Sequence, residues 1–245
     1  MSKSYPMFKA AACHVAPFFL DTARTVDKTL SLIEEAADNG ASLVAFPESF
    51  VPGFPVWAAL RAPILNHEFF LARAREALRT DGPELQLIRA AARRRGVHVS
   101  LGFTEGTEAS VGCLWNSNIH IGSDGAVLNL HRKLVPTFYE KLIWASGDAR
   151  GLRVVATDIG RIGMLICGEN TNPLSRFALM AEGEQVHIST YPPLADTAAD
   201  AKGRLRFAPS DRDPGRRPCV RSQGIQHRVV SLRRPNPEGK HRQRG

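Results

Sequence analysis

The sequence predicts an α/β fold built in layers, with sheets that hold both parallel and antiparallel strands. Over residues 1–193, short apolar runs of strand length alternate with segments that carry a helical apolar stripe. Turn residues between several neighbouring runs also indicate hairpins. Alternating helices and strands favour parallel pairing, whereas hairpins require antiparallel pairing, so we expect both kinds of pairing.

The first elements in this pattern are a strand and a helix. Residues 8–16 are apolar and short, as a buried strand is, and Asp21 or Thr22 then offers an N-cap for a helix. Gly40 is placed to end that helix. The apolar stripe of the predicted helix consists of Val26, Leu30, Ile33 and Ala37.

The next segments predict a strand, a second helix and three further strands. Residues 43–46 are an apolar run that is too short for a helix and ends at Pro47. Pro83, after Gly82, stands where a first helical residue is expected, and Gly96 is placed to end this second helix. The strands predicted after it cover residues 97–103, 118–121 and 126–130.

The last predicted elements are a hairpin, a helix and a strand. Residues 154–158 and 162–166 flank Gly160 and indicate a hairpin. Residues 173–181 have helical character, and residues 186–190 return to the pattern of a strand.

The charge of the chain is concentrated in its last part. The chain has 245 residues and a net charge of +8. Residues 1–193 hold 19 Lys and Arg against 19 Asp and Glu, whereas residues 194–245 hold 13 against 5. This balance disfavours a globular nucleic-acid binder with a basic groove. We expect a catalytic domain over 1–193, followed by an Arg-rich tail over 194–245 that buries too little apolar surface to become ordered.

Composition also excludes several other classes of protein. No apolar run approaches the roughly 18–20 residues that span a bilayer, and the N-terminal segment does not resemble a secretion signal. The four cysteines lie far apart without a CxxC pair, which indicates neither a zinc site nor a disulfide framework. We therefore expect a reducing, cytoplasmic setting and no membrane partner.

Side chains that could carry chemistry stand at the ends of three predicted strands. Glu48 follows the first of them, and Lys133 ends a basic cluster after the second. Cys167 ends the third, beside Gly168, whose backbone N–H could stabilise a developing negative charge. Each residue alone also fits a simpler interpretation: a solvated loop acid, a charged sheet edge that discourages aggregation, and a small buried hydrophobic side chain.

Three extended segments nevertheless resemble the signatures of one family. The segment FPESF surrounds Glu48, HRKLVPTFYEKLIWASGD surrounds Lys133, and ICGENTNPLSRFALMAEGEQVHISTYPP surrounds Cys167. In this order they resemble the nitrilase branch of the carbon–nitrogen hydrolases. The resemblance implies an αββα sandwich, incomplete at its C-terminus here. It also implies a catalytic triad of Glu48, Lys133 and Cys167, with Glu140 as a second glutamate beside it.

The implied reaction converts a nitrile and water to a carboxylic acid and ammonia. Cys167 is the expected nucleophile and Glu48 the general base, while Lys133 and the Gly168 N–H stabilise developing negative charge. The intermediates are a thioimidate and then a thioester, and the mechanism requires no metal or organic cofactor. Amides and carbamoyl compounds are the alternative substrates within the same family.

The walls of the substrate pocket are harder to assign. Many nitrilases carry a tryptophan directly after the nucleophile, whereas this chain has Gly168, which widens the space beside the thiol. Trp57, Tyr139 and Tyr191 are candidate pocket walls, and ordinary core or interface positions fit them equally well.

The resemblance ends near Pro193, where members of the family continue with further strands and helices. The loss of periodicity and the rise in arginine predict a frameshift or truncation near residues 193–195. The family forms homo-oligomers, and we expect this C-terminus to interfere with that assembly. Two alternatives of another class stay open: a nucleic-acid-tethered binding protein, whose tail would bind without sequence preference, and an inactive fragment that only binds metabolites.

Overall fold

The structure is a computed structural model that describes residues 7–192, 197–199, 205–207 and 228–231. Its strands fall into a six-stranded sheet, a three-stranded sheet and a separate two-stranded ribbon. The six-stranded sheet has the order β11-β1-β2-β3-β4-β5, and the three-stranded sheet the order β6-β7-β8. The strands of the larger sheet are β1 (Lys9–Ala12), β2 (Leu43–Ala45), β3 (His98–Glu105), β4 (Trp115–Ile121), β5 (Val127–Arg132) and β11 (Arg228–Ser231). Those of the smaller sheet are β6 (Val155–Thr157), β7 (Gly160–Ile166) and β8 (Val186–Thr190).

Both sheets mix strand directions, as the sequence predicts. In the larger sheet, β11, β1, β2 and β3 pair in parallel, whereas β3, β4 and β5 pair antiparallel. In the smaller sheet, β6 and β7 form the predicted antiparallel hairpin, and β8 joins β7 in parallel.

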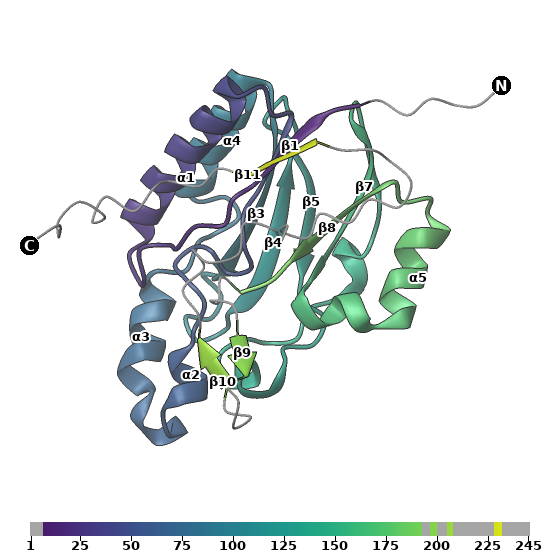
Figure 1. The fold of residues 1–245 in the computed structure, drawn as a ribbon. Coiled ribbons are helices and arrows are strands. Elements are labelled where there is room, and N and C mark those ends of the chain that lie inside the picture. The colour runs from purple at the N-terminus through teal and green to yellow at the C-terminus, as the bar shows by residue number, and fades with distance from the viewer. Residues whose placement is uncertain (1–6, 193–196, 200–204, 208–227, 232–245) are drawn as a thin grey trace, which may run out of the picture.

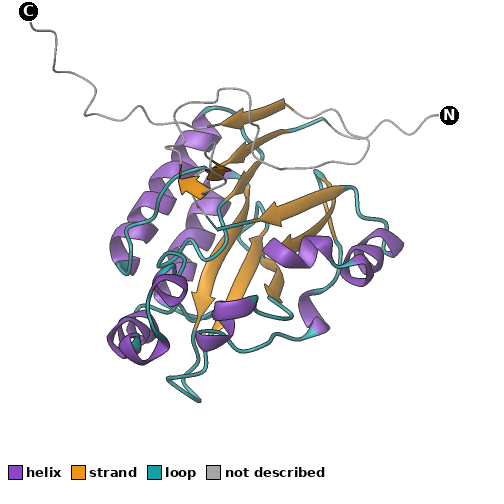
Figure 2. Cartoon of the chain, turned by 60° about the horizontal axis from the view of Figure 1, so that its bottom comes forward, coloured by secondary structure: helices purple, strands orange, loops and turns teal. Residues whose placement is uncertain are grey.

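Helices cover the outer faces of the two sheets. Figure 1 shows α1 (Thr22–Asp38) and α4 (Pro83–Arg95) side by side on one face of the larger sheet, and α5 (Pro173–Ala181) beyond the smaller sheet. The turned view in Figure 2 shows the strands between these helical layers. The predicted α/β class is therefore confirmed, and its layers follow the order α-β-β-α.

The ends of the predicted helices follow from local capping. The Asp21 side chain accepts a hydrogen bond from the Arg24 N–H at 3.0 Å and so caps the start of α1. At the end of α4, Gly96 adopts a left-handed backbone conformation with φ of 63°, which glycine reaches without steric cost.

Two further helices lie where the sequence analysis predicts none. They are α2 (Trp57–Leu60) and α3 (His67–Arg75), separated by a short 3-10 helix, η1 (Pro63–Leu65). In α3 the fully buried side chain is Arg73, whereas the neighbouring Phe69 and Phe70 are only half-buried. This inversion of the usual amphipathic pattern removes the signal by which a surface helix is predicted.

Two apolar cores hold the layers together. One fills the space between the larger sheet and α1 and α4, and includes Ile33, Ile88 and Leu101. The other lies between the two sheets and includes Leu43 and Ile188.

The inner face of β3 and β4 also carries a row of buried polar side chains, namely His98, Ser100, Thr104, Asn116, Asn118 and His120. Buried polar groups need hydrogen-bond partners, and Asn116 of this row is a hydrogen-bond partner of the site described below.

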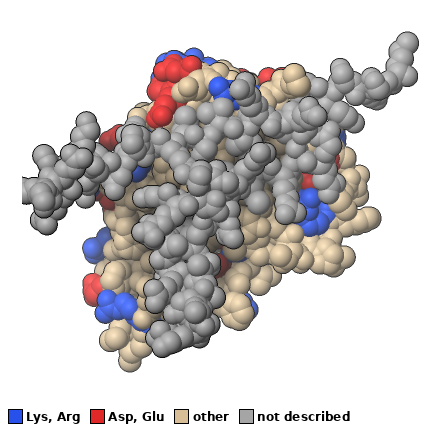
Figure 3. All heavy atoms as spheres, viewed as in Figure 1, with Lys and Arg blue, Asp and Glu red and all other residues tan. Residues whose placement is uncertain are grey.

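Much of the predicted tail lies outside the described residues. Within 194–245 the structure places three short strands that the sequence analysis does not expect: β9 (Thr197–Ala199) and β10 (Leu205–Phe207), which pair antiparallel, and β11 at the edge of the larger sheet. The domain boundary at residue 193 stays a prediction. On the described surface of the face in Figure 3, Lys and Arg side chains are scattered among acidic and uncharged ones.

Candidate active site

The three candidate residues at strand ends come from both sheets. Glu48 lies three residues after β2, and Lys133 follows β5 directly, so both lie beyond strand ends of the larger sheet. Cys167 follows β7 of the smaller sheet and begins a 3-10 helix, η4 (Cys167–Thr171). The Glu48 charge raises the pKa of the Cys167 thiol and the Lys133 charge lowers it, so the three side chains lie within range of one another's charges.

The Lys133 ammonium group lies between two carboxylates. Its Nζ donates to Glu48 Oε1 at 2.8 Å and to Glu140 Oε2 at 2.7 Å. All three side chains are buried. A buried ion pair needs such direct hydrogen bonds to offset the cost of removing its charges from water. With both carboxylates ionised, one ammonium group leaves this cluster with a net negative charge.

Glu48 is held by both its backbone and its side chain. Its backbone N–H donates to the carbonyl of Tyr191, after β8, at 3.0 Å. Asn116 Nδ2 donates to Glu48 Oε1 at 2.7 Å, so the polar row on β4 fixes the carboxylate. Glu48 Oε2 is buried without a hydrogen-bond partner among the described residues. This second oxygen is free to accept a proton.

A glycine on β3 lets the Glu48 segment approach the sheet closely. A Cβ atom at Gly102 would lie 2.2 Å from the carbonyl oxygen of Pro47 and 2.9 Å from Glu48 Cα. Real side chains do not tolerate such distances to backbone atoms, so only glycine permits this packing.

Glu140 is positioned by its own helix. It lies in the 3-10 helix η2 (Phe138–Leu142), and its Oε2 accepts the N–H of Thr137 at 3.0 Å. The same oxygen accepts from Lys133. The start of η2 therefore fixes the carboxylate that the lysine contacts.

Cys167 adopts a backbone conformation that is uncommon for a residue with a side chain. Its φ is 50°, in the left-handed region. Asn170 Nδ2 donates to the Cys167 carbonyl at 2.9 Å, and Asn170 Oδ1 accepts from His187 on β8 at 2.7 Å. The thiol is partly exposed. Such strain persists only where the surroundings enforce it, and it is typical of functional positions.

The pKa values of the three groups are shifted by burial and by one another. Burial raises the pKa of Glu48 to about 7, although Lys133 opposes the rise. Burial lowers the pKa of Lys133, but Glu48 and Glu140 more than offset this, so the net shift is upward. Burial and the Glu48 charge raise the pKa of the Cys167 thiol to about 12. At neutral pH the site thus holds a protonated thiol, an ammonium group and a carboxylate close to its own pKa.

The remaining candidates lie at different distances from this cluster. The backbone N–H of Gly168 donates toward the Cys167 sulfur, and a Cβ atom at Gly168 would meet only Thr137 Oγ1, at 3.5 Å. Tyr139 is half-buried. Burial raises the pKa of its hydroxyl, and the charges of Glu140 and Cys167 raise it further. Tyr191 contacts Glu48 through its backbone, and 45% of its surface is exposed.

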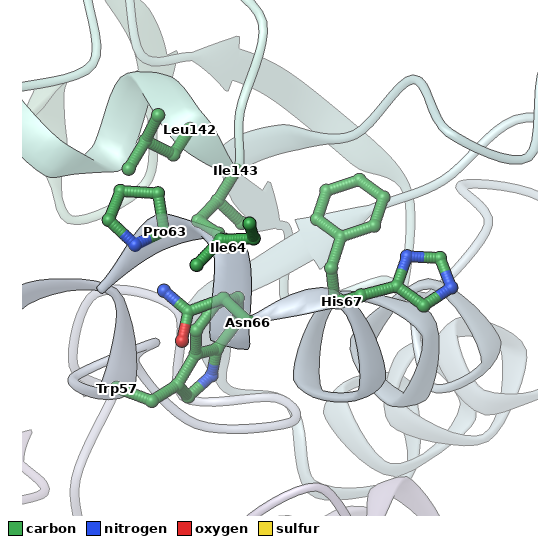
Figure 4. Close-up of a pocket in the computed structure, with 8 residues that line it drawn as sticks. Trp57, Pro63, Ile64, Asn66, His67, Leu142 and Ile143 are labelled. Carbon is green, nitrogen blue, oxygen red and sulfur yellow. The ribbon is translucent and has the colours of Figure 1, made fainter. Parts of the chain in front are cut away.

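Trp57 lies in an apolar cluster beyond this site. Its ring stacks on Phe69 with centroids 5.5 Å apart. It lines a pocket of about 420 Å³ (Figure 4). The lining of that pocket consists of Trp57, Pro63, Ile64, Asn66, His67, Phe70, Leu142 and Ile143. Leu142 and Ile143 lie at the end of η2, which connects this pocket to the helix that carries Glu140.

Sequence reasoning missed three residues that support the site. Asn116 binds Glu48, and Glu169 binds backbone groups beside Cys167 and Lys133. Arg73 donates to Thr104 Oγ1 at 2.6 Å and to the carbonyl of Gly53, beneath the loop that follows Glu48. The polar alternation along β4 could have indicated Asn116, whereas nothing in the local sequence marks Arg73.

Neither a metal cluster nor a membrane span is found in the described parts of the chain. Within those ranges, three or more His, Cys, Asp or Glu side chains nowhere gather in a way that could hold a metal ion. No helix there is both long and apolar enough to cross a bilayer.

Comparison with known proteins finds one family. The family described as carbon–nitrogen hydrolase matches residues 9–206. A bromoxynil-specific nitrilase of Klebsiella pneumoniae subsp. ozaenae is 40% identical over 185 residues, which are 76% of this chain and 52% of that protein. A cyanide hydratase of Botryotinia fuckeliana is 41% identical over 186 residues, again 76% of this chain and 49% of that protein.

The chain thus spans about half the length of these curated relatives. Among solved structures, the C. elegans NitFhit protein is similar with a TM-score of 0.62 and 22% identity. That similarity covers 76% of this chain and 43% of the other, and it supports the αββα arrangement.

Proposed function

The chain belongs to the nitrilase branch of the carbon–nitrogen hydrolase family, and from this membership we propose that it hydrolyses a nitrile to the carboxylic acid and ammonia. In this proposal Cys167 is the nucleophile, Glu48 the general base and Lys133 the group that stabilises negative charge. Glu140 keeps Lys133 in place.

One observation carries the proposal. A buried lysine lies within hydrogen-bond distance of two buried carboxylates, at 2.8 and 2.7 Å, and its charge acts on a partly exposed, strained cysteine. A purely structural ion pair would not need a second carboxylate, an unpartnered carboxylate oxygen or a thiol held at positive φ. Perturbed groups gathered in this way are typical of catalytic sites.

The first step of the proposed reaction uses Glu48 and Cys167. A thiol with a pKa near 12 is protonated at rest and needs a base. A carboxylate with a pKa near 7 is a better base at neutral pH than an ordinary glutamate. Glu48 accepts the thiol proton while sulfur forms a bond to the nitrile carbon. Glu48 then passes this proton to the nitrile nitrogen, and the product is a thioimidate.

The later steps release both products. Water adds to the thioimidate carbon, the C–N bond breaks, and ammonia leaves a thioester on Cys167. A second water then breaks the C–S bond, which yields the carboxylic acid and returns the thiol proton. Two waters are consumed for each nitrile. Lys133 and the Gly168 N–H are the donors placed to stabilise the negative charge that develops in each addition.

The open space beside Gly168 and one of the named relatives favour nitriles of some bulk. The bromoxynil-specific nitrilase is named for an aromatic nitrile, and the space beside Gly168 is open to a substituent. Tyr139 and Tyr191 are the candidate walls closest to the site, while Trp57 would contact only an extended substrate. Amide hydrolysis is the runner-up, since the same thioester would form from an amide.

The setting of the chain forms part of the proposal. Cys13, Cys113 and Cys167 are free thiols, which supports a reducing, cytoplasmic compartment. The exposed apolar side chains Leu174 and Phe177 on α5 offer a surface for the family's homo-oligomers, and we expect the C-terminal segment to interfere with that assembly. The catalytic domain is taken as residues 1–193.

Ammonia release from a panel of small aliphatic and aromatic nitriles tests the proposal. We expect the full chain to release ammonia and the Cys167→Ala variant to release none above the uncatalysed rate. Cys113→Ala serves as the matched control and should retain the rate of the full chain. Equal rates in the full chain and Cys167→Ala would refute the assigned nucleophile, and release from amides alone would favour the runner-up.

A further inference from the structure

A buried glutamate next to the nucleophile has no role in the reaction proposed above. Glu169 lies two residues after Cys167 in η4. Its Oε2 accepts the N–H of Ile166 at 2.8 Å and the ring Nε2–H of His131 at 2.9 Å. Its Oε1 accepts the N–H of Leu134 at 2.6 Å. Three donors thus converge on one carboxylate that lies in the interior of the protein.

Two of these donors are the backbone neighbours of the proposed catalytic residues. Ile166 precedes Cys167, and Leu134 follows Lys133. The first is the last residue of β7 in the smaller sheet, and the second lies two residues after the end of β5 in the larger sheet. Among the described strands, no backbone ladder joins these two sheets. The distance between nucleophile and lysine therefore depends on side chains that cross between them.

We infer that Glu169 is a positioning residue that holds Cys167 and Lys133 at a fixed separation across the two sheets. This inference rests on the proposed function, because it gives Cys167 and Lys133 their catalytic meaning. Glu169 touches neither the thiol nor the ammonium group in the contacts described and acts only through their backbone neighbours.

The strained backbone of Cys167 explains why the hydrogen bonds of Ile166 and Leu134 to Glu169, called the Glu169 brace below, are needed. At φ of 50° the residue would relax toward the ordinary region of negative φ if its turn were free. Asn170 restrains the carbonyl of Cys167 from the side of β8. Glu169 restrains the preceding N–H from the side of β5. Release on either side lets the sulfur rotate away from Glu48 and Lys133.

The chemistry of the carboxylate makes the role specific. Aspartate keeps the charge but is one methylene shorter, so it cannot reach both backbone donors. Glutamine keeps the length, but its NH₂ group would face a backbone N–H, donor against donor. Both substitutions therefore break the Glu169 brace. The two variants differ in charge, since Glu169→Asp keeps the carboxylate and Glu169→Gln does not, and this difference separates positioning from an electrostatic effect on the thiol.

The test measures the alkylation of each cysteine by iodoacetamide at about pH 8, resolved by mass spectrometry of the peptides. Positioning predicts that Glu169→Asp and Glu169→Gln both slow alkylation of Cys167 about tenfold, because the displaced lysine and base no longer assist the thiolate. Cys113, which is half-exposed, should keep its rate. Cys13 is buried and should stay slow unless the protein unfolds.

A matched control variant is available directly after α3. Glu76 is also a carboxylate that accepts a backbone N–H, that of Thr22 at 2.7 Å. Glu76→Gln should leave the alkylation rate of Cys167 unchanged. In nitrile hydrolysis, the two Glu169 variants should lower kcat while KM stays near that of the full chain. A loss of folded protein would also expose Cys13 to alkylation, so a lower kcat with Cys13 still unreactive indicates positioning.

Several results would overturn the inference. Alkylation of Cys167 at the full chain's rate in Glu169→Asp would do so. Faster alkylation in Glu169→Gln with no change in Glu169→Asp would instead assign Glu169 an electrostatic role. If Cys13 becomes reactive in both variants, His131→Phe decides: it removes one of the three donors, and slower alkylation of Cys167 supports the inference while an unchanged rate refutes it.

The test also separates this inference from the proposed function. Alkylation requires no nitrile, so slowed alkylation without any nitrile hydrolysis would support the positioning role and refute the proposed reaction. Nitrile hydrolysis with unaltered alkylation in the Glu169 variants would do the reverse.

Discussion

At the scale of single residues, the site depends on one cation shared by two carboxylates. Glu48 and Glu140 compete for Lys133, and the charge of Glu140 contributes to the raised pKa of Glu48. A group of this kind titrates as a unit, so a pH profile reports the cluster rather than one member. Glu140 therefore affects both the position of Lys133 and the pKa of Glu48.

Replacing Glu140 by glutamine separates these two effects. We expect the rate of nitrile hydrolysis to fall about 10–100-fold, because the lysine loses a charge-assisted hydrogen bond. We also expect the acid limb of the pH–rate profile to move to lower pH, since removal of the Glu140 charge lowers the pKa of Glu48. The measurement is the rate as a function of pH in both proteins.

Glu108→Gln provides the control for this prediction. Glu108 is an exposed glutamate that pairs with Arg79, and its replacement should leave both the rate and the profile unchanged. An acid limb of Glu140→Gln that coincides with that of the unmodified chain would contradict the coupling between the two carboxylates.

The sequence indicates the proposed reactive groups of this site more directly than the residues that support them. Glu48, Lys133 and Cys167 each stand at the end of an apolar run, a position visible in one sequence. Asn116 and Glu169 act through contacts that span 68 and 35 residues along the chain. Such contacts depend on how the two sheets pack, which local patterns do not encode.

At the scale of elements, the close approach of the Glu48 loop to β3 positions the proposed general base. Gly102→Ala would place a methyl group against three backbone atoms of residues 47–49, between 2.2 and 2.9 Å away. The backbone cannot rotate away as a side chain can, so the loop or the strand must move. We expect a loss of about 1–3 kcal/mol in the free energy of unfolding and a larger relative loss of hydrolysis.

Denaturant unfolding and hydrolysis rates measure these two losses. Gly112→Ala is the matched control, because a methyl group at that position would meet nothing within 4 Å. Unchanged stability and rate in Gly102→Ala would show that the close approach is not needed to position Glu48.

The elements themselves are predicted well where helical or strand periodicity is intact. The predicted bounds of α5 and β8 match the structure, and α1 and α4 begin and end at the predicted caps. The prediction fails over α2 and α3. In α3 the buried side chain is Arg73, which hydrogen-bonds to Thr104 and lies over the Trp144 ring, so polarity is a poor guide to burial in that helix.

At the scale of the whole molecule, both sheets contribute to the site, and their packing links its chemistry to stability. Glu48 lies at the end of the larger sheet and hydrogen-bonds to the strand end of the smaller one. Removal of this carboxylate from water raises its pKa from 4.5 to about 7. The proton on Glu48 is therefore coupled to the folding of the entire domain.

This coupling makes stability depend on pH in a definite direction. Between about pH 4.5 and about pH 7 the folded chain retains a proton on Glu48 that the unfolded chain releases, so a rise in pH favours unfolding. The contribution is fully present below about pH 4.5 and is lost as the pH passes through about 7.

Glu48→Gln cannot release a proton and lacks this dependence. It also leaves Lys133 paired with Glu140 alone, a balanced pair. We therefore expect the Tm of Glu48→Gln minus the Tm of the unmodified chain to increase by about 2–4 °C or more from about pH 5 to about pH 8. Thermal unfolding followed by circular dichroism at the two pH values measures this gain. Glu108→Gln, with an exposed carboxylate, should show none, and a difference that shrinks with rising pH would contradict the raised pKa.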